Sequence, residues 1–236
     1  MKSNRTILPD AQTTSLRVGT ADIPFTTFVR RLGLLILDNF ILDKHKHSST
    51  VCRSVFVQIR RLSSVRQYLT VEATKALAPF FVSKLGCCNS LLSGWALYCL
   101  IIRLQTVQNS AAKLVFKERK RGHVQPLLQA LHWLPDQARI DYKLSAICHS
   151  FFSNSSPAYF SDLLTVCTPS RQFRSSADTR IFPIAHVRTT TFGQRCFSDC
   201  VPKRWNSLPS DIRHIQSSHA FTTALKTHLY KQYHNR

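Results

Sequence analysis

Residues 51–69 read VCRSVFVQIRRLSSVRQYL, and this stretch decides the class of fold. Its apolar residues recur at spacings of three and four, the pattern of an amphipathic helix with one buried side. They are Val51, Val55, Ile59, Leu62, Val65 and Leu69. Arg53, Arg60, Arg61 and Arg66 fall outside this stripe. The sequence therefore predicts a helix with a basic surface.

The helical spacing continues along much of the chain. Thr70 suits the cap of a second helix, with Glu72 in the first turn, where the helix dipole favours an acid. Pro79 is expected to kink that helix. Further helices are predicted over residues 97–117, 124–131, 137–152 and 218–232, and Pro157 can open a brief one.

Two segments lack helical spacing. Residues 28–42, FVRRLGLLILDNFIL, predict an apolar strand, a turn at Asp38-Asn39 and a short apolar return. Residues 165–205, rich in Thr, Ser, Arg, Phe and Pro, predict extended segments around 180–188 and 190–198. We therefore predict a mainly α fold of the α+β class. It comprises a flexible arm over 1–27, an amphipathic helical bundle over 28–164, and a mixed region over 165–236 in which an extended or β segment precedes a C-terminal helix.

The charge balance points to the kind of partner. The 236 residues carry 32 Lys and Arg against 12 Asp and Glu, a net charge of +20. A compact protein with this excess repels itself, so a polyanion such as RNA or DNA is the partner that the composition favours. The excess is greatest over residues 51–130, where 12 basic and 2 acidic residues give +10. A hydrophobic content of 44% excludes a wholly disordered chain.

The candidate nucleic-acid-binding residues are the basic side chains of the helices expected over 49–69 and 97–121. They are Arg53, Arg60, Arg61, Arg66, Arg103, Lys113, Lys117, Arg119, Lys120 and Arg121. The last four end a helix, where the dipole favours cations, and a merely solvated charged surface is the alternative interpretation of that run.

Aromatic and amide side chains could add contacts to bases. Trp133 in LHWLP and Trp205 in WNSLP are expected in the core beside proline turns, with base stacking as the alternative. Gln108 and Asn109 could bind a base edge, but amides on helices more often form local hydrogen bonds.

The eight cysteines are interpreted as reduced, buried thiols. The N-terminal MKSNRTILPDAQ lacks the apolar stretch of a signal peptide, so we expect an intracellular protein of the nucleus or cytoplasm, not a secreted one. We expect no cofactor and no metal. The alternative is a zinc site from residues with ligand spacing: Cys196 and Cys200 with His186 and His214, or His45 and His47.

Known catalytic patterns are missing from the sequence. The motifs GxxxxGK[ST], GxGxxG and GxSxG do not occur. A site for two metal ions favours paired carboxylates, and no two acidic residues are adjacent in this sequence. We expect no small-molecule substrate. Residues 85–102, LGCCNSLLSGWALYCLII, are uncharged and approach the length of a membrane span, but Asn89, Ser90 and Ser93 interrupt them. We therefore expect no membrane partner, and membrane association through residues 85–102 is the alternative.

Nine segments in collinear order carry a family resemblance. They are VRRLGLLILDNFILDKH (29–45), FFVSKLGCCNSLLSG (80–94), RLQTVQNSAAKLV (103–115), LLQALHWLP (127–135), RIDYKL (139–144), SPAYFSDLL (156–164), TPSRQFRSS (168–176), FGQRCFSDCVPKRWNSLP (192–209) and FTTALKTHLY (221–230). Together they resemble the region that follows the polymerase core in LINE-type, jockey-like non-LTR retrotransposon reverse transcriptases.

The resemblance implies a thumb-like helical region and tail that would hold a template–primer duplex or target DNA. The family's polymerase Asp-Asp box and its endonuclease lie upstream of the matched part, so no catalytic residue carries over and the chain is not expected to be an enzyme on its own. Gly86-Cys87 stands where the family has Asp-Tyr. The implied activity is non-specific binding to the RNA or DNA backbone, and the alternative is a transposon relic without a selected function. Nothing in the sequence indicates an oligomeric state.

Overall fold

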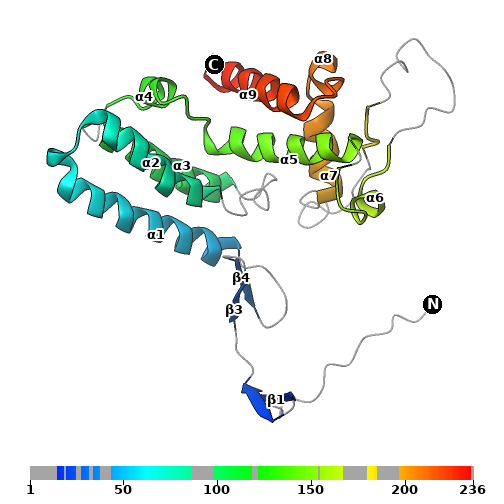
Figure 1. Cartoon of the computed structure of the whole chain (residues 1–236), viewed down its shortest axis with the longest axis horizontal. Helices are drawn as coiled ribbons and strands as arrows, with labels where there is room; N and C mark the ends of the chain where they lie inside the picture. The colour runs from blue at the N-terminus through cyan, green and yellow to red at the C-terminus, as the bar shows by residue number, and fades with distance from the viewer. Residues whose placement is uncertain are drawn as a thin grey trace. The chain divides into compact units, whose positions relative to one another are not determined.

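The structure of the chain is a computed structural model. It describes residues 15–18, 20–24, 28–31, 34–37, 44–86, 98–118, 122–153, 155–166, 180–184 and 197–234. The chain divides into two compact units, Met1–His47 and Ser48–Arg236 (Figure 1). This boundary differs from the divisions at residues 28 and 165 that the sequence led us to expect.

The first unit contains two short antiparallel hairpins. β1 (Ser15–Val18) pairs with β2 (Ala21–Pro24), and β3 (Phe28–Arg31) pairs with β4 (Leu34–Leu37). The first hairpin lies within residues 1–27, for which the sequence predicted only a flexible arm. Four-residue strands carry little periodicity, and this explains why the pattern was missed.

The second hairpin reverses direction earlier than predicted. Arg31 pairs with Leu34, so the return strand begins at Leu34 and not after Asp38-Asn39. Two-residue connections are the commonest in β-hairpins. The prediction gave more weight to Asp38-Asn39 because Asp and Asn are frequent in turns.

The second unit is a bundle of α-helices, which confirms the mainly α class. α1 (Lys44–Val65) leads into the 3-10 helix η1 (Arg66–Tyr68), and α2 (Val71–Leu85) and α3 (Tyr98–Phe116) follow. Thr70 caps α2 as predicted, since its Oγ1 accepts a hydrogen bond of 3.2 Å from the backbone nitrogen of Ala73.

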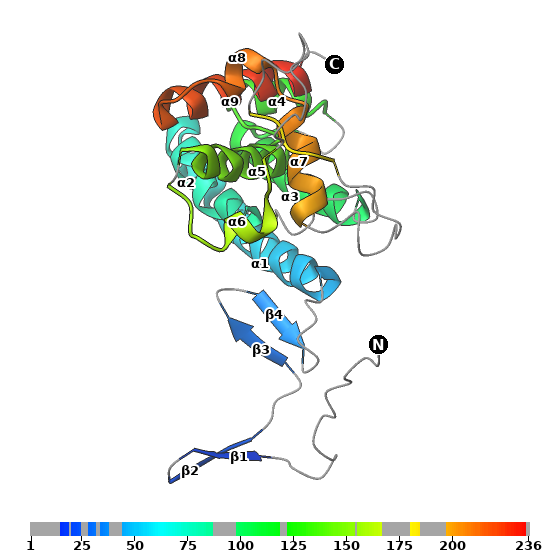
Figure 2. The same cartoon turned by 90° about the vertical axis from the view of Figure 1, so that its right-hand side faces the viewer.

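The other described helices are α4 (Gln125–Ala130), α5 (Asp136–Phe152), α6 (Phe160–Leu163), α7 (Phe197–Asn206), α8 (Ser210–Arg213) and α9 (Ser218–His234). The bounds of α3, α4, α5 and α9 agree with the predicted ranges to within two residues. α5 packs against α3, α7 and α9, which explains why residues 165–236 do not form a separate unit (Figure 2).

The core of the second unit contains an aromatic cluster. Trp205 is fully buried, stacks on Phe152 with ring centroids 5.3 Å apart, and lies 5.9 Å from the ring of Phe221. Its Nε1 donates a hydrogen bond of 2.7 Å to the carbonyl of Arg180. These contacts confirm Trp205 as a core side chain.

The helix α7 is absent from the sequence predictions. Phe197, Val201 and Trp205 recur at a spacing of four, and this signal could have located it. Residues 197–198 therefore belong to a helix and not to the extended segment expected around 190–198. Residues 180–184 have no regular secondary structure, and residues 185–196 lie outside the described part of the chain.

Candidate nucleic-acid interface

A groove follows α1 and α3, which run in the same direction. Near the starts of both helices, Nη1 of Arg103 in α3 lies 3.5 Å from the hydroxyl of Ser49 in α1. At the other end, Arg66, which directly follows α1, contacts the last turn of α3. The groove has a volume of about 500 Å³. Arg53 and Arg60 of α1 and Arg103 of α3 all line it. The structure thus brings three of the ten candidate residues together.

The arginines of this groove face solvent without a competing acid. Arg53, Arg60 and Arg103 are exposed, and Arg53 and Arg60 form no hydrogen bond or ion pair with other described residues. Neither α1 nor α3 contains an Asp or Glu. Over residues 44–117 there are 11 Lys and Arg and a single acid, Glu72, a net charge of +10. The groove is therefore a site of positive potential.

The remaining candidates divide into several groups. Arg61 is exposed on α1 but does not line the groove, because its neighbour Arg60 lies about 100° away around the helix. Lys113 is half-buried and Lys117 is exposed, both at the far end of α3. Arg119, Lys120 and Arg121 lie outside the described residues.

Arg66 is a correction to the predicted interface. Its side chain is buried, with a residue exposure of only 4%. Nε donates to the carbonyl of Leu114 at 3.0 Å, and Nη2 donates to that of Val115 at 2.7 Å. Nη1 donates to the carbonyl of Leu69 at 2.7 Å. The end of α3 leaves carbonyls unpaired and attracts a cation, so Arg66 is a helix cap and is not available to a phosphate.

The helical spacing itself explains this error. Arg66 lies four residues after the buried Leu62, about 40° further around the helix axis, so it falls on the buried side and not outside the apolar stripe. Val65 lies about 60° from Leu62 in the opposite sense and is 45% exposed, although it belongs to the predicted apolar stripe.

Two helices end on a residue in the left-handed region. Lys117 follows α3 with φ 57°, and His132 follows α4 with φ 52°. After α3, the backbone nitrogen of Lys117 bonds to the carbonyl of Leu114, and that of Glu118 bonds to the carbonyl of Lys113. This pair of bonds is the Schellman motif, whose left-handed position usually holds glycine. The position of Lys117 is therefore set by the end of its helix.

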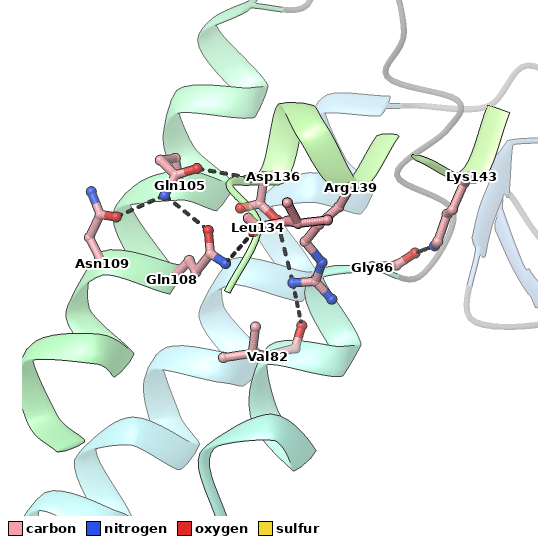
Figure 3. A network of polar contacts seen from close by, with 9 residues as sticks. All are labelled: Val82, Gly86, Gln105, Gln108, Asn109, Leu134, Asp136, Arg139 and Lys143. Atoms are coloured by element: carbon pink, nitrogen blue, oxygen red, sulfur yellow. Dashed lines mark hydrogen bonds and ion pairs between the residues drawn. The ribbon is translucent and has the colours of Figure 1, made fainter. Parts of the chain in front are cut away.

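The amides of α3 form a buried network with the segment before α5 (Figure 3). Gln105 Nε2 donates to Gln108 Oε1 at 2.9 Å and to Asn109 Oδ1 at 2.8 Å. Gln108 Nε2 donates to the carbonyl of Leu134 at 2.9 Å, and Gln105 Oε1 accepts from the backbone nitrogen of Asp136 at 2.9 Å. Gln108 is fully buried, and both its Oε1 and its Nε2 are engaged in these hydrogen bonds, so its amide is not available to a base edge.

Asp136 is a buried carboxylate beside this network. Its Oδ1 lies 3.7 Å from Nη1 of Arg139, and neither carboxylate oxygen forms a hydrogen bond with the described residues. Burial raises the pKa of Asp136 to about 6, against an opposing effect of the Arg139 charge.

The described cysteines include three buried ones. Cys52, Cys148 and Cys200 are buried and Cys99 is exposed. Burial raises the pKa of the Cys52 and Cys148 thiols. Among the residues that the structure describes, no three His, Cys, Asp or Glu side chains are close enough to hold a metal ion, and no helix is long and apolar enough to cross a membrane. Several residues of the zinc and membrane alternatives lie outside this part of the chain: His186, Cys196 and residues 87–97.

Comparisons with protein-family models, with curated proteins and with solved structures found no match. The fold and the groove together define a class, a mainly helical basic protein with an arginine-lined groove along two parallel helices.

Proposed function

We propose that the chain binds the phosphate backbone of RNA or DNA through the groove between α1 and α3. The observation that carries this proposal is the convergence of Arg53, Arg60 and Arg103 on one groove without an acid on either helix. Arginine is suited to this role because its planar guanidinium can donate two parallel hydrogen bonds to a phosphate.

The spacing along α1 supports contacts with separate phosphates. Arg53 and Arg60 are seven residues apart, which corresponds to about 10.5 Å along a helix axis. Phosphates of one strand of a duplex are about 3.4 Å apart along its axis, so the two arginines span about three of them. Phosphate contacts position a protein without reading sequence, and Gln108 is buried. We therefore expect binding with little dependence on sequence.

The resemblance to LINE-type reverse transcriptases supports the same proposal from a different direction. The region that the chain resembles follows the polymerase core, and a basic helical bundle there would hold a nucleic-acid duplex. We propose that the chain is derived from such a retrotransposon and has no polymerase or endonuclease chemistry of its own. Purified chain, supplied with Mg²⁺ and a primed RNA template, is expected to add no nucleotides. Template-dependent extension by clean protein would refute this part of the proposal.

The salt dependence of binding tests the groove. For Arg53→Gln combined with Arg60→Gln, we expect the slope of log K against log salt to become shallower by about 1.8 on duplex DNA and about 1.4 on single strands. Fluorescence anisotropy at several salt concentrations measures both slopes.

A matched control uses two exposed cations away from the groove. The side chains of Lys84 in α2 and Lys231 in α9 form no hydrogen bond or ion pair with described residues, so Lys84→Gln combined with Lys231→Gln removes the same charge without loss of a side-chain contact. This variant is expected to keep the wild-type slope. Equal changes in the two double variants would contradict the groove and leave only attraction to the net charge.

A further inference from the structure

A separate pocket of about 460 Å³ lies between α2, α3, α5, α9 and the segment that joins α4 to α5. Gln108 lines this pocket and Thr106 lines the arginine groove. These residues are two positions apart on α3 and so about 200° apart around its axis. The pocket and the groove are therefore on opposite sides of α3.

Three cationic side chains from two helices line the pocket. Arg139 and Lys143 come from α5, and Lys226 comes from α9. No Asp or Glu is among its lining residues. Lys226 is exposed and forms no hydrogen bond or ion pair with the described residues. The lining residues thus carry a positive charge, of which the part from Arg139 is paired with the Asp136 carboxylate 3.7 Å away.

The cations on α5 are held in place by α2 (Figure 3). Arg139 Nη1 donates to the carbonyl of Val82 at 3.3 Å, and Lys143 Nζ donates to the carbonyl of Gly86. The Nε and Nη2 groups of Arg139 have no hydrogen-bond partner among the described residues, so they remain available to a ligand. Gly86 permits this arrangement, because a Cβ there would lie 3.2 Å from Arg139 Nη2.

Aromatic side chains complete the pocket. Trp133 and Tyr142 are half-buried and line it together with apolar residues such as Val82 and Leu134. Half-buried aromatic rings beside fixed cations provide both a surface for a planar ring and donors for an anion. The volume lies within the range of small-molecule sites.

We propose that this pocket binds a phosphate-bearing ligand of mononucleotide size. Arg139, Lys143 and Lys226 bind the phosphate, and the planar base contacts Trp133 and Tyr142. From the sequence we expected no small-molecule substrate, so this proposal differs from that expectation. The proposal does not depend on strand binding in the groove.

Calorimetric titration with AMP, adenosine and ribose 5-phosphate tests the two parts of the ligand. At about 0.15 M salt, where charges beyond about 8 Å are screened, we expect saturable binding of AMP. Adenosine lacks the phosphate and ribose 5-phosphate lacks the base, so each should bind at least about tenfold more weakly. Equal affinity for AMP and adenosine, or no saturation by AMP at millimolar concentrations, would overturn the proposal.

A pair of lysines on α9 supplies the variant and its control. Lys226→Ala is expected to weaken AMP binding about tenfold, since it removes a charged hydrogen-bond donor. Lys231 is exposed on the same helix but does not line the pocket, so Lys231→Ala should leave the affinity unchanged. The same loss in both variants would contradict a localised site.

The phosphate could come from a free nucleotide or from the end of a strand, and a 5′-phosphorylated trinucleotide separates these sources. Tighter binding of the trinucleotide than of AMP, lost in Lys226→Ala, identifies a strand end. Binding of AMP at least as tight as that of the trinucleotide identifies a free nucleotide. AMP binding should persist in the Arg53→Gln, Arg60→Gln variant, so failure of the groove and failure of the pocket are distinguishable.

Discussion

Nη2 of Arg66 lies 2.7 Å from the carbonyl oxygen of Val115, and both atoms are buried. This hydrogen bond joins the end of α1 to the end of α3, 49 residues further along the chain. It holds the two helices side by side, and the groove with Arg53, Arg60 and Arg103 follows the same pair of helices. Arg66, which we predicted from the sequence to bind nucleic acid, therefore stabilises the pair of helices that carries the other arginines.

Replacing this buried arginine should destabilise the fold. Arg66→Ala leaves the carbonyls of Leu114 and Val115 without their side-chain donor, and we expect the free energy of unfolding to fall by about 3 kcal/mol. Arg66→Lys keeps the charge but cannot reach three carbonyls, so its loss should be intermediate. Urea denaturation followed by circular dichroism measures both. Arg61→Ala, at an exposed neighbour, is the control, and a loss as large as that of Arg66→Ala would contradict the capping role.

The left-handed residues at the ends of α3 and α4 offer stabilising substitutions. Lys117→Gly and His132→Gly each relieve a strained Cβ, which costs about 1–2 kcal/mol, against a glycine entropy cost of up to about 1 kcal/mol. We expect a net gain of about 0.5–1 kcal/mol for each. Thermal unfolding measures the gain. Lys117→Ala removes the same charge but keeps the Cβ, so an equal gain there would assign the effect to charge and not to backbone conformation.

The buried Asp136 should make stability depend on pH. Its pKa is raised from 3.8 to about 6 in the folded chain, so the folded state holds the proton more tightly than the unfolded state. This contribution to stability is fully present below pH 3.8 and is lost as the pH rises through about 6. The difference between a pKa of 3.8 and one of about 6 corresponds to a change of about 3 kcal/mol in the free energy of unfolding.

The isosteric change Asp136→Asn isolates that contribution. Its stability relative to wild type should rise between pH 4 and pH 7 and then level off, with a gain of up to about 3 kcal/mol. Chemical denaturation at a series of pH values measures this difference. Asp162→Asn, at an exposed aspartate of α6, controls for net charge and should give a difference that does not vary with pH. A flat profile for Asp136→Asn would refute the raised pKa.

Gln108 should contribute to stability and not to base recognition. Gln108→Ala leaves the carbonyl of Leu134 without its donor and removes a partner of Gln105, so we expect a loss of about 2 kcal/mol. Thr106→Ala, at an exposed position of the same helix, should change stability by no more than about 0.5 kcal/mol. Differential scanning calorimetry compares the two. A selective loss of binding to one base, with stability unchanged, would contradict this assignment.

Several segments that carry the family resemblance meet inside the second unit. Gln108 of RLQTVQNSAAKLV binds the carbonyl of Leu134 in LLQALHWLP. Asp141 of RIDYKL accepts a hydrogen bond of 2.6 Å from the hydroxyl of Tyr233 and lies 3.2 Å from Nε of Arg204. These residues of the quoted segments thus form packing and hydrogen-bonding contacts of the fold.

The long helices could be predicted because their signal is local. α3 and α5 show apolar residues every three or four positions, and Thr70 needs only its own hydroxyl and a neighbouring backbone nitrogen to cap α2. The turn of the β3–β4 hairpin was predicted at the wrong place, and helix α7 was not predicted. Both elements are short, and a short element takes its structure from the segments that pack on it.

The sequence alone determined the helical class, the order of the long helices and the concentration of positive charge over residues 51–130, since all three follow from residue spacing and composition. Only the tertiary structure decided how the cations are used: Arg53, Arg60 and Arg103 converge on one groove, whereas Arg66 caps α3 from within. The physical reason is that burial of a side chain depends on which distant segment packs over it. A guanidinium beside water and one beside three carbonyls look alike in a sequence and differ only in their surroundings.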